Sequence, residues 1–136
     1  MEVAPMPFQT RNQKIAHLAF KEIKEMERVK SLQAGERERF ASMAKKLPFL
    51  VRTAGLAQAI SFLEAKSKSS DADKALLSGL SATVTVMMNF PTGDLFTEKC
   101  RNANNLSEYI RLTETTLEAL EWFKRFSESV LPVQEK

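Results

Sequence analysis

The stretch LSEYIRLTETTLEALEWFKRFSESV, residues 106–130, contains neither glycine nor proline and repeats apolar side chains at intervals of three and four. This spacing gathers the apolar side chains on one face of an α-helix. We therefore predict a long final helix from Leu106 to Val130. Its predicted packing stripe consists of Leu106, Tyr109, Ile110, Thr113, Leu117, Leu120, Phe123 and Phe126.

The face opposite this stripe is charged. It carries Glu114, Glu118, Glu121 and Arg125, which is typical of a helix face that meets solvent or a basic neighbour. Trp122 lies beside the main stripe, where it either packs into the core at the helix end or forms part of a contact surface, since tryptophan is favoured at protein interfaces. The candidate protein interface therefore comprises Trp122, Glu114, Glu118 and Glu121.

The rest of the chain also has helical patterns. Apolar spacing predicts helices over residues 11–32, 36–46 and 48–66, a fourth beginning at 71, and a short one over 94–100. The boundaries follow from residue preferences at helix ends. They are Thr10 as the N-cap of the first helix, Gly35 as its stop, Pro48 in the first turn of the third helix, and Asp71 and Asp94 as caps.

The fourth helix includes Thr83–Val86, a run with strand propensity. We predict helix there because a lone strand would find no partner elsewhere in this chain. Residues 1–10 are predicted to be an extended tail, and residues 67–70 and 89–94 surface connections. The predicted fold is all-α: one domain over residues 1–136, built as a compact bundle of five or six helices.

Composition excludes several classes of protein. A chain of 136 residues buries enough surface to form a core without a metal or disulfide staple. Cys100 and His17 are the only residues of their types, so neither a disulfide framework nor a zinc site with four Cys or His ligands is possible. The first residues do not resemble a signal peptide, and no apolar run is long enough to span a membrane. We expect a cytoplasmic protein with no cofactor, metal or membrane contact.

The charge is unevenly distributed along the chain. Residues 1–70 hold 13 basic and 7 acidic side chains, whereas residues 71–136 hold 7 basic and 10 acidic ones. On a helical wheel, one arc of the first helix gathers basic side chains without an acidic one, which suits either a solvated face or successive phosphates of a nucleic acid strand. That arc consists of Lys14, His17, Lys21, Lys24 and Arg28.

The third predicted helix has a broad apolar arc and is expected to be central. Gly55 lies inside it, where a glycine costs about 1 kcal/mol relative to alanine and is best explained by close approach of another helix. Arg52 projects into the apolar arc, where its charge must reach solvent, pair, or meet a ligand. Lys45 and Lys46 add positive charge just before this helix.

No catalytic motif stands out. The chain has no nucleophile elbow and no glycine-rich phosphate loop, so neither catalytic residues nor a small-molecule substrate are expected. One short pattern, Arg11-Asn12 followed by His17, resembles the Arg/His signature of HEPN ribonucleases. This pattern leaves a ribonuclease as one alternative function. A second alternative is a helical adaptor that binds only proteins.

Two blocks carry a more specific resemblance, AKKLPFLVRTAGLAQAISFL at residues 44–63 and YIRLT with LEALEWFKRF at residues 109–113 and 117–126. They resemble the small subunit of the Cmr complex, the type III-B CRISPR effector. Members of that family have Lys-x-Pro-x-x-(Ile/Val) leading to Gly-Leu-x-x-Ala, then Tyr-(Leu/Ile)-x-Leu-Thr and Trp-(Leu/Phe)-Lys-Arg-Phe. The matching residues are Lys46, Pro48, Val51, Gly55, Leu56, Ala59, Tyr109, Leu112, Thr113, Trp122, Lys124, Arg125 and Phe126.

The resemblance implies a small non-catalytic helical subunit that acts in antiviral defence. Such a subunit stacks head-to-tail with copies of itself beside the backbone and large subunits, and helps to accommodate CRISPR RNA and target RNA. The uneven charge fits this role, because head-to-tail stacking needs two different complementary faces. The candidate RNA-binding residues are Lys14, Lys21, Lys24, Arg28, Lys45, Lys46 and Arg52.

Overall fold

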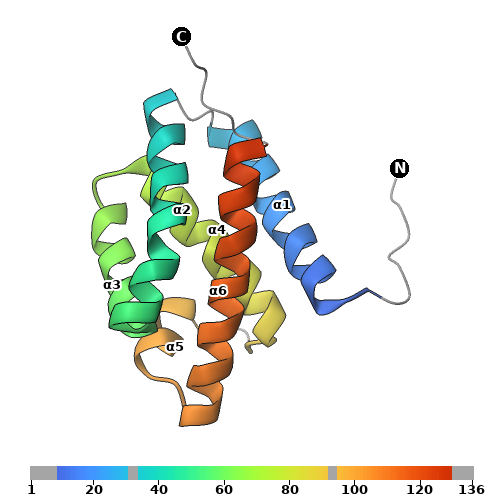
Figure 1. The fold of residues 1–136 in the computed structure, drawn as a ribbon, viewed down its shortest axis with the longest axis vertical. Coiled ribbons are helices and arrows are strands. Elements are labelled where there is room, and N and C mark those ends of the chain that lie inside the picture. Colours follow the sequence, from blue (N-terminus) through green and yellow to red (C-terminus); the bar gives the residue numbers. More distant parts are fainter. Residues whose placement is uncertain (1–8, 31–33, 92–94, 130–136) are drawn as a thin grey trace.

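The computed structural model describes residues 9–30, 34–91 and 95–129, without the side chains of residues 28–30 and 34. These residues form six α-helices and contain no strand, which confirms the predicted all-α bundle (Figure 1). The helices are α1 Arg11–Lys30, α2 Ala34–Ala54, α3 Leu56–Ser67, α4 Asp71–Met88, α5 Phe96–Arg101 and α6 Leu106–Ser129.

Helix α6 is the hub of the bundle. It packs against α1, α2 and α4, and it lies between α1 and α2 (Figure 1). Helix α3 packs on α2 and α4, and the short α5 contacts α3 and α4 at one end of the bundle. The core between these helices is mainly apolar. Its largest fully buried side chains are Phe40, Phe123, Ile15, Ile23, Leu47, Leu56, Ile60, Leu63, Leu76, Leu80, Leu112 and Leu120.

Short polar side chains begin several of these helices. Thr10 is the predicted N-cap of α1: its Oγ1 accepts from the Gln13 backbone N–H at 3.0 Å, and Gln13 Oε1 accepts from the Thr10 N–H at 2.9 Å. The fourth helix is capped by Ser70 instead of Asp71, since Ser70 Oγ accepts from the Asp73 N–H at 3.3 Å. The Thr83–Val86 run is helical, as predicted.

The predicted boundary between the second and third helices was wrong. Helix α2 continues through Pro48 to Ala54, although proline removes a backbone donor and disfavours a helix interior. The residues around it supply the reason. Phe40, Leu47 and Val51 form one continuous buried stripe, and packing along this stripe outweighs the local cost of proline.

The chain breaks at Gly55, between α2 and α3, where φ is +93° and ψ is 158°. This is a region that essentially only glycine occupies. Gly55 was predicted to allow close approach of another helix, and that explanation was wrong: a Cβ there would meet only Tyr109 Oη, at an ordinary 3.7 Å. The close helix contact is at Gly79 of α4, where a Cβ would lie 3.1 Å from Phe123 Cε1.

Replacing Gly55 by alanine is therefore expected to lower the free energy of unfolding by about 1 to 2 kcal/mol, because the new Cβ is strained at this φ. Urea denaturation followed by circular dichroism measures the loss. Gly35→Ala is the matched control, since Gly35 lies in a helix and a Cβ there meets nothing within 4 Å. Equal stability of the two variants would contradict the assigned role of the backbone angle.

The packing stripe of α6 was predicted only in part: Leu120 and Phe123 are buried, and Tyr109, Leu117 and Phe126 pack against the core, but its start is not covered. Leu106 is 73% exposed and Ile110 is 47% exposed, because the first turns of α6 extend past the helices that cover its later turns. The buried face instead includes two threonines. Thr116 donates to the Leu112 carbonyl at 2.8 Å, and Thr115 lies against Met88. The buried residues of α6 are Leu112, Thr115, Thr116, Ala119, Leu120, Phe123 and Ser127.

Other boundaries shifted by a few residues. Helix α1 ends at Lys30, and Gly35, the predicted stop, lies in the first turn of α2. The N-cap of α5 is Leu95, without a side-chain hydrogen bond. Several predictions fall outside the described residues: the tail over residues 1–8, the cap at Asp94, residues 92–94 of the predicted connection, and Val130.

Candidate nucleic-acid interface

The basic arc of α1 faces solvent. Lys14, His17, Lys21 and Lys24 are all exposed, because α1 buries its opposite side against α4 and α6. Lys24 Nζ lies 3.4 Å from Glu27 Oε1, a weak surface pair. The fifth residue, Arg28, belongs to α1, but its side chain lies outside the description.

The cations of α2 form a separate surface. Lys45, Lys46 and Arg52 are exposed, so the prediction that Arg52 lies in an apolar arc was wrong. The Nζ atoms of Lys46 and Lys66 lie 5.8 and 5.5 Å from the ring centre of Phe62 in α3. Since α6 lies between α1 and α2 (Figure 1), the structure does not join the candidate RNA-binding residues into one stripe.

An aromatic cluster borders the basic arc where α1 meets α6. The Phe20 and Phe126 rings are 5.4 Å apart in an edge-on arrangement, and Trp122 stacks on Phe126 at 5.4 Å. The Trp122 indole N–H donates to Asn12 Oδ1 at 3.0 Å, and the Arg125 guanidinium lies 5.1 Å from the indole ring. Phe20 remains 41% exposed. We call Phe20, Phe126 and Trp122 the aromatic cluster.

The candidate protein-interface residues are largely engaged within the chain. Trp122 is half-buried, and Glu118 Oε1 accepts from Arg11 Nη2 at 3.1 Å. Glu121 lies 4.0 Å from Arg125, whereas Glu114 is exposed. The acidic face of α6 therefore holds the start of α1 in place, and Glu114 is its most accessible carboxylate.

The structure does not assemble Arg11 and His17 into a site. The Arg11 guanidinium turns toward α6, where it donates to Glu118 at 3.1 Å and to Thr115 Oγ1 at 2.5 Å. His17 instead borders an open depression beside Phe20 and Lys21. No hydrogen bond in the described part of the chain links the two side chains, and this geometry gives no support to the ribonuclease alternative.

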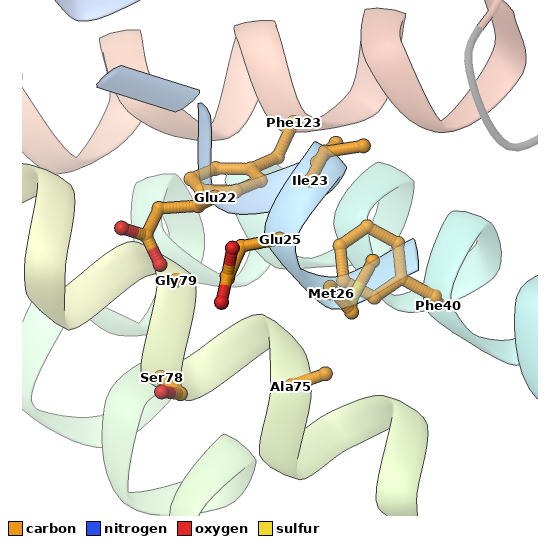
Figure 2. A pocket seen from close by; sticks show the side chains of 9 residues that line it. All are labelled: Glu22, Ile23, Glu25, Met26, Phe40, Ala75, Ser78, Gly79 and Phe123. Carbon is orange, nitrogen blue, oxygen red and sulfur yellow. The ribbon is translucent and has the colours of Figure 1, made fainter. Parts of the chain in front are cut away.

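A second hollow, of about 120 Å³, lies where α1, α2, α4 and α6 meet (Figure 2). Its floor is apolar, formed by Phe40, Phe123 and Met26, and the carboxylates of Glu22 and Glu25 point toward α4 at its mouth. Partial burial, opposed by Lys21 and assisted by Glu25, raises the pKa of Glu22. The surroundings of Glu22 disfavour its ionised form, so the hollow is a poor binding site for an anionic ligand.

Other reactive groups are few in the described residues. Burial raises the pKa of Cys100 to about 12, so its thiol is protonated and unreactive at neutral pH. Among the residues with described positions, no three His, Cys, Asp or Glu side chains are grouped to hold a metal ion. None of the described helices has the length and apolar run needed to cross a membrane.

The fold and its surface features define a class of protein: a small helical bundle with exposed cations, among them those of α1 and α2, and, in the described residues, no assembled catalytic group. The comparisons with known proteins agree. The family model described as CRISPR-associated protein (Cas_Cmr5) matches residues 11–130. The chain belongs to this Cmr5 family, the small subunits of the type III-B Cmr complex.

A relative and a solved structure give the degree of similarity. The "CRISPR system Cmr subunit Cmr5" of Thermus thermophilus is 38% identical over 109 residues, which are 79% of this chain and 90% of that protein. A crystal structure of a CRISPR-associated Cmr5 family protein from Thermus thermophilus superimposes with a TM-score of 0.67 at 33% identity, covering 93% of this chain and 100% of the other. The resemblance inferred from residues 44–63 and 109–126 is thereby confirmed.

Sequence reasoning missed the aromatic cluster. Phe126 had been assigned to the packing stripe of α6 and Trp122 to a protein interface, while Phe20 was not singled out. A signal was present, since Phe20 lies at the edge of the basic arc of α1 on a helical wheel. The missing information was its neighbour, because only the packing of α1 on α6 brings Phe20 against Phe126.

Proposed function

We propose that this protein is a non-catalytic, cytoplasmic subunit of a type III-B CRISPR ribonucleoprotein complex in antiviral defence. Copies stack head-to-tail beside the backbone and large subunits, and the basic arc of α1 contacts the phosphates of CRISPR RNA or target RNA. The observation that carries this proposal is the exposure of Lys14, Lys21 and Lys24 along one face. They span about 15 Å of helix, enough for several phosphates of a single strand.

The second basic surface extends the proposal. Lys45, Lys46 and Arg52 are exposed on α2, which α6 separates from α1 (Figure 1), so they would contact a different segment of RNA from the one on α1. Glu114, the accessible carboxylate of α6, is the proposed contact to the basic half of a neighbouring copy. Trp122, Glu118 and Glu121 support it by holding α1, α6 and Arg125 in place.

The test is to replace Lys14, Lys21 and Lys24 together by glutamate and to measure binding of fluorescent single-stranded RNA between 50 and 200 mM salt, roughly the range over which phosphate contacts dominate. We expect at least about a tenfold loss of affinity at low salt. The slope of log K against log salt should fall by about 2, since each phosphate contact in a single strand contributes about 0.7.

The matched control replaces three other exposed cations by glutamate, Lys68, Lys74 and Arg111, on the connection before α4, on α4 and on α6. This control changes the net charge by the same amount. If the basic arc of α1 is the RNA-binding surface, the control should lower RNA affinity much less. Equal effects in the two variants, or an unchanged slope in the first, would count against the α1 surface. RNA recovered intact after incubation supports a non-catalytic subunit, whereas cleavage that His17→Ala abolishes would favour the ribonuclease alternative. Absence of any RNA binding would favour the protein-only adaptor.

A further inference from the structure

Phe20 is an exposed aromatic side chain in a basic surface. It is 41% exposed, and it lines an open depression on α1 together with His17, Lys21 and Lys24. The core side of the same helix is fully covered, as Ile15 and Ile23 show. A single exposed apolar side chain is common on protein surfaces. An exposed aromatic ring beside cationic side chains, however, is typical of surfaces that bind single-stranded nucleic acid.

The aromatic cluster holds this ring in a defined position. Phe20 rests against Phe126 at 5.4 Å with 73° between the ring planes, and Phe126 is in turn covered by Trp122 at 5.4 Å. The hydrogen bond from Trp122 to Asn12, at 3.0 Å, ties this support back to α1. The Phe20 ring is therefore held in place before any ligand binds. Stacking of a ligand on it costs little side-chain entropy of the protein.

We propose that Phe20 is a base-stacking residue: it receives a nucleobase of single-stranded RNA while His17 and Lys21 face the adjacent phosphates. Glu25 and Glu27 also line the depression, and Glu27 pairs with Lys24 at 3.4 Å, so the phosphates would lie on the His17 and Lys21 side. Stacking on a ring is tolerant of sequence, because every base has a π-face. This inference rests on the proposed function, since it assumes that the α1 surface meets RNA.

The test compares two probes, a short single-stranded RNA of mixed sequence and inorganic polyphosphate, a polyanion without bases. Phe20→Leu keeps an apolar contact with Phe126 and removes the ring. We expect it to weaken RNA binding by roughly fivefold to tenfold, the range that loss of one stacked base predicts. Polyphosphate binding and the salt slope should not change. Phe20→Tyr should restore RNA affinity, because it keeps a ring.

Each result decides between the two proposals. If wild-type protein binds RNA with a salt-dependent affinity that Phe20→Leu leaves unchanged, the stacking proposal is overturned and the RNA-binding function stands. If Phe20→Leu weakens polyphosphate binding equally, the ring acts only through the fold, and stacking is again overturned. If the variant loses self-association in sedimentation without losing RNA affinity, Phe20 contacts a second copy instead. If neither probe binds the wild-type chain, both proposals fail. Thermal denaturation of both variants checks that they fold.

Discussion

Replacing Phe123 by alanine is expected to lower the free energy of unfolding by about 4 kcal/mol, the usual cost of removing a fully buried phenylalanine. Phe123 lies in the second half of α6 and is 1% exposed. Its ring packs edge-on against Phe40 of α2 at 6.5 Å, and it lies close to the backbone of α4 at Gly79. One side chain thus joins three helices, and truncation removes contacts with all of them.

The hollow beside Phe123 is a further reason to expect a large loss of stability in Phe123→Ala. The ring already forms part of the wall of this space between α1, α2, α4 and α6 (Figure 2). Its removal would enlarge the hollow, and the cost of a truncation rises with the volume left unfilled. Chemical denaturation with circular dichroism as the signal provides the measurement.

Phe49→Ala is the matched control, because Phe49 of α2 is the same residue type but 66% exposed. Its replacement should change the free energy of unfolding by less than about 1 kcal/mol. A loss below about 1 kcal/mol in Phe123→Ala as well would show that the packing of α6 on α2 and α4 is not the main source of stability.

Replacing Arg39 by methionine is expected to cost about 2 to 3 kcal/mol, because it leaves a buried carboxylate without its cation. Asp73, in the first turn of α4, is 0% exposed, and its Oδ2 accepts from Arg39 Nε at 3.1 Å. The described structure gives its other oxygen, Oδ1, no hydrogen-bond partner. Arg39 is 45% exposed, and solvent screening therefore places the cost at the lower end of that for buried pairs.

The experiment is a double-mutant cycle followed by urea denaturation. Asp73→Asn removes the charge, so adding it to Arg39→Met should recover part of the lost stability. Arg101→Met is the control, because its partner Glu64, at 3.0 Å, is 39% exposed, and a surface pair contributes at most about 1 kcal/mol. If Arg39→Met were no more costly than Arg101→Met, the ion pair between α2 and α4 would not stabilise the fold.

The start of α4 shows why local sequence rules identify an element but not all of its contacts. The pattern from residue 71 onward predicts a helix, and Asp71 is an ordinary cap by local preference. In the structure Ser70 caps instead, and Glu36 of α2 accepts from the Ala72 N–H at 2.8 Å. The partner is 36 residues away in the chain, and no spacing rule reveals it.

The candidate interface was only partly predictable for the same reason. A helical wheel places Lys14, Lys21 and Lys24 on one face, and the structure leaves them exposed as expected. A wheel describes a single helix, so it could not show that α2, which carries Lys45 and Arg52, is separated from α1 by α6. Nor could it show that Arg11 is held by Glu118.

By itself, the sequence determined the class of fold, a bundle of five or six helices with their order along the chain, and the family. These depend on the three- and four-residue spacing of apolar side chains and on the motif blocks, which are local properties. Tertiary structure decided the break at Gly55 in place of Pro48, the buried face of α6, the division of the basic residues between two surfaces, and the support of Phe20 by Phe126. At Pro48, packing along a continuous buried stripe outweighed a local cost of about 3 kcal/mol, and the other features depend on contacts between segments that are distant in the chain.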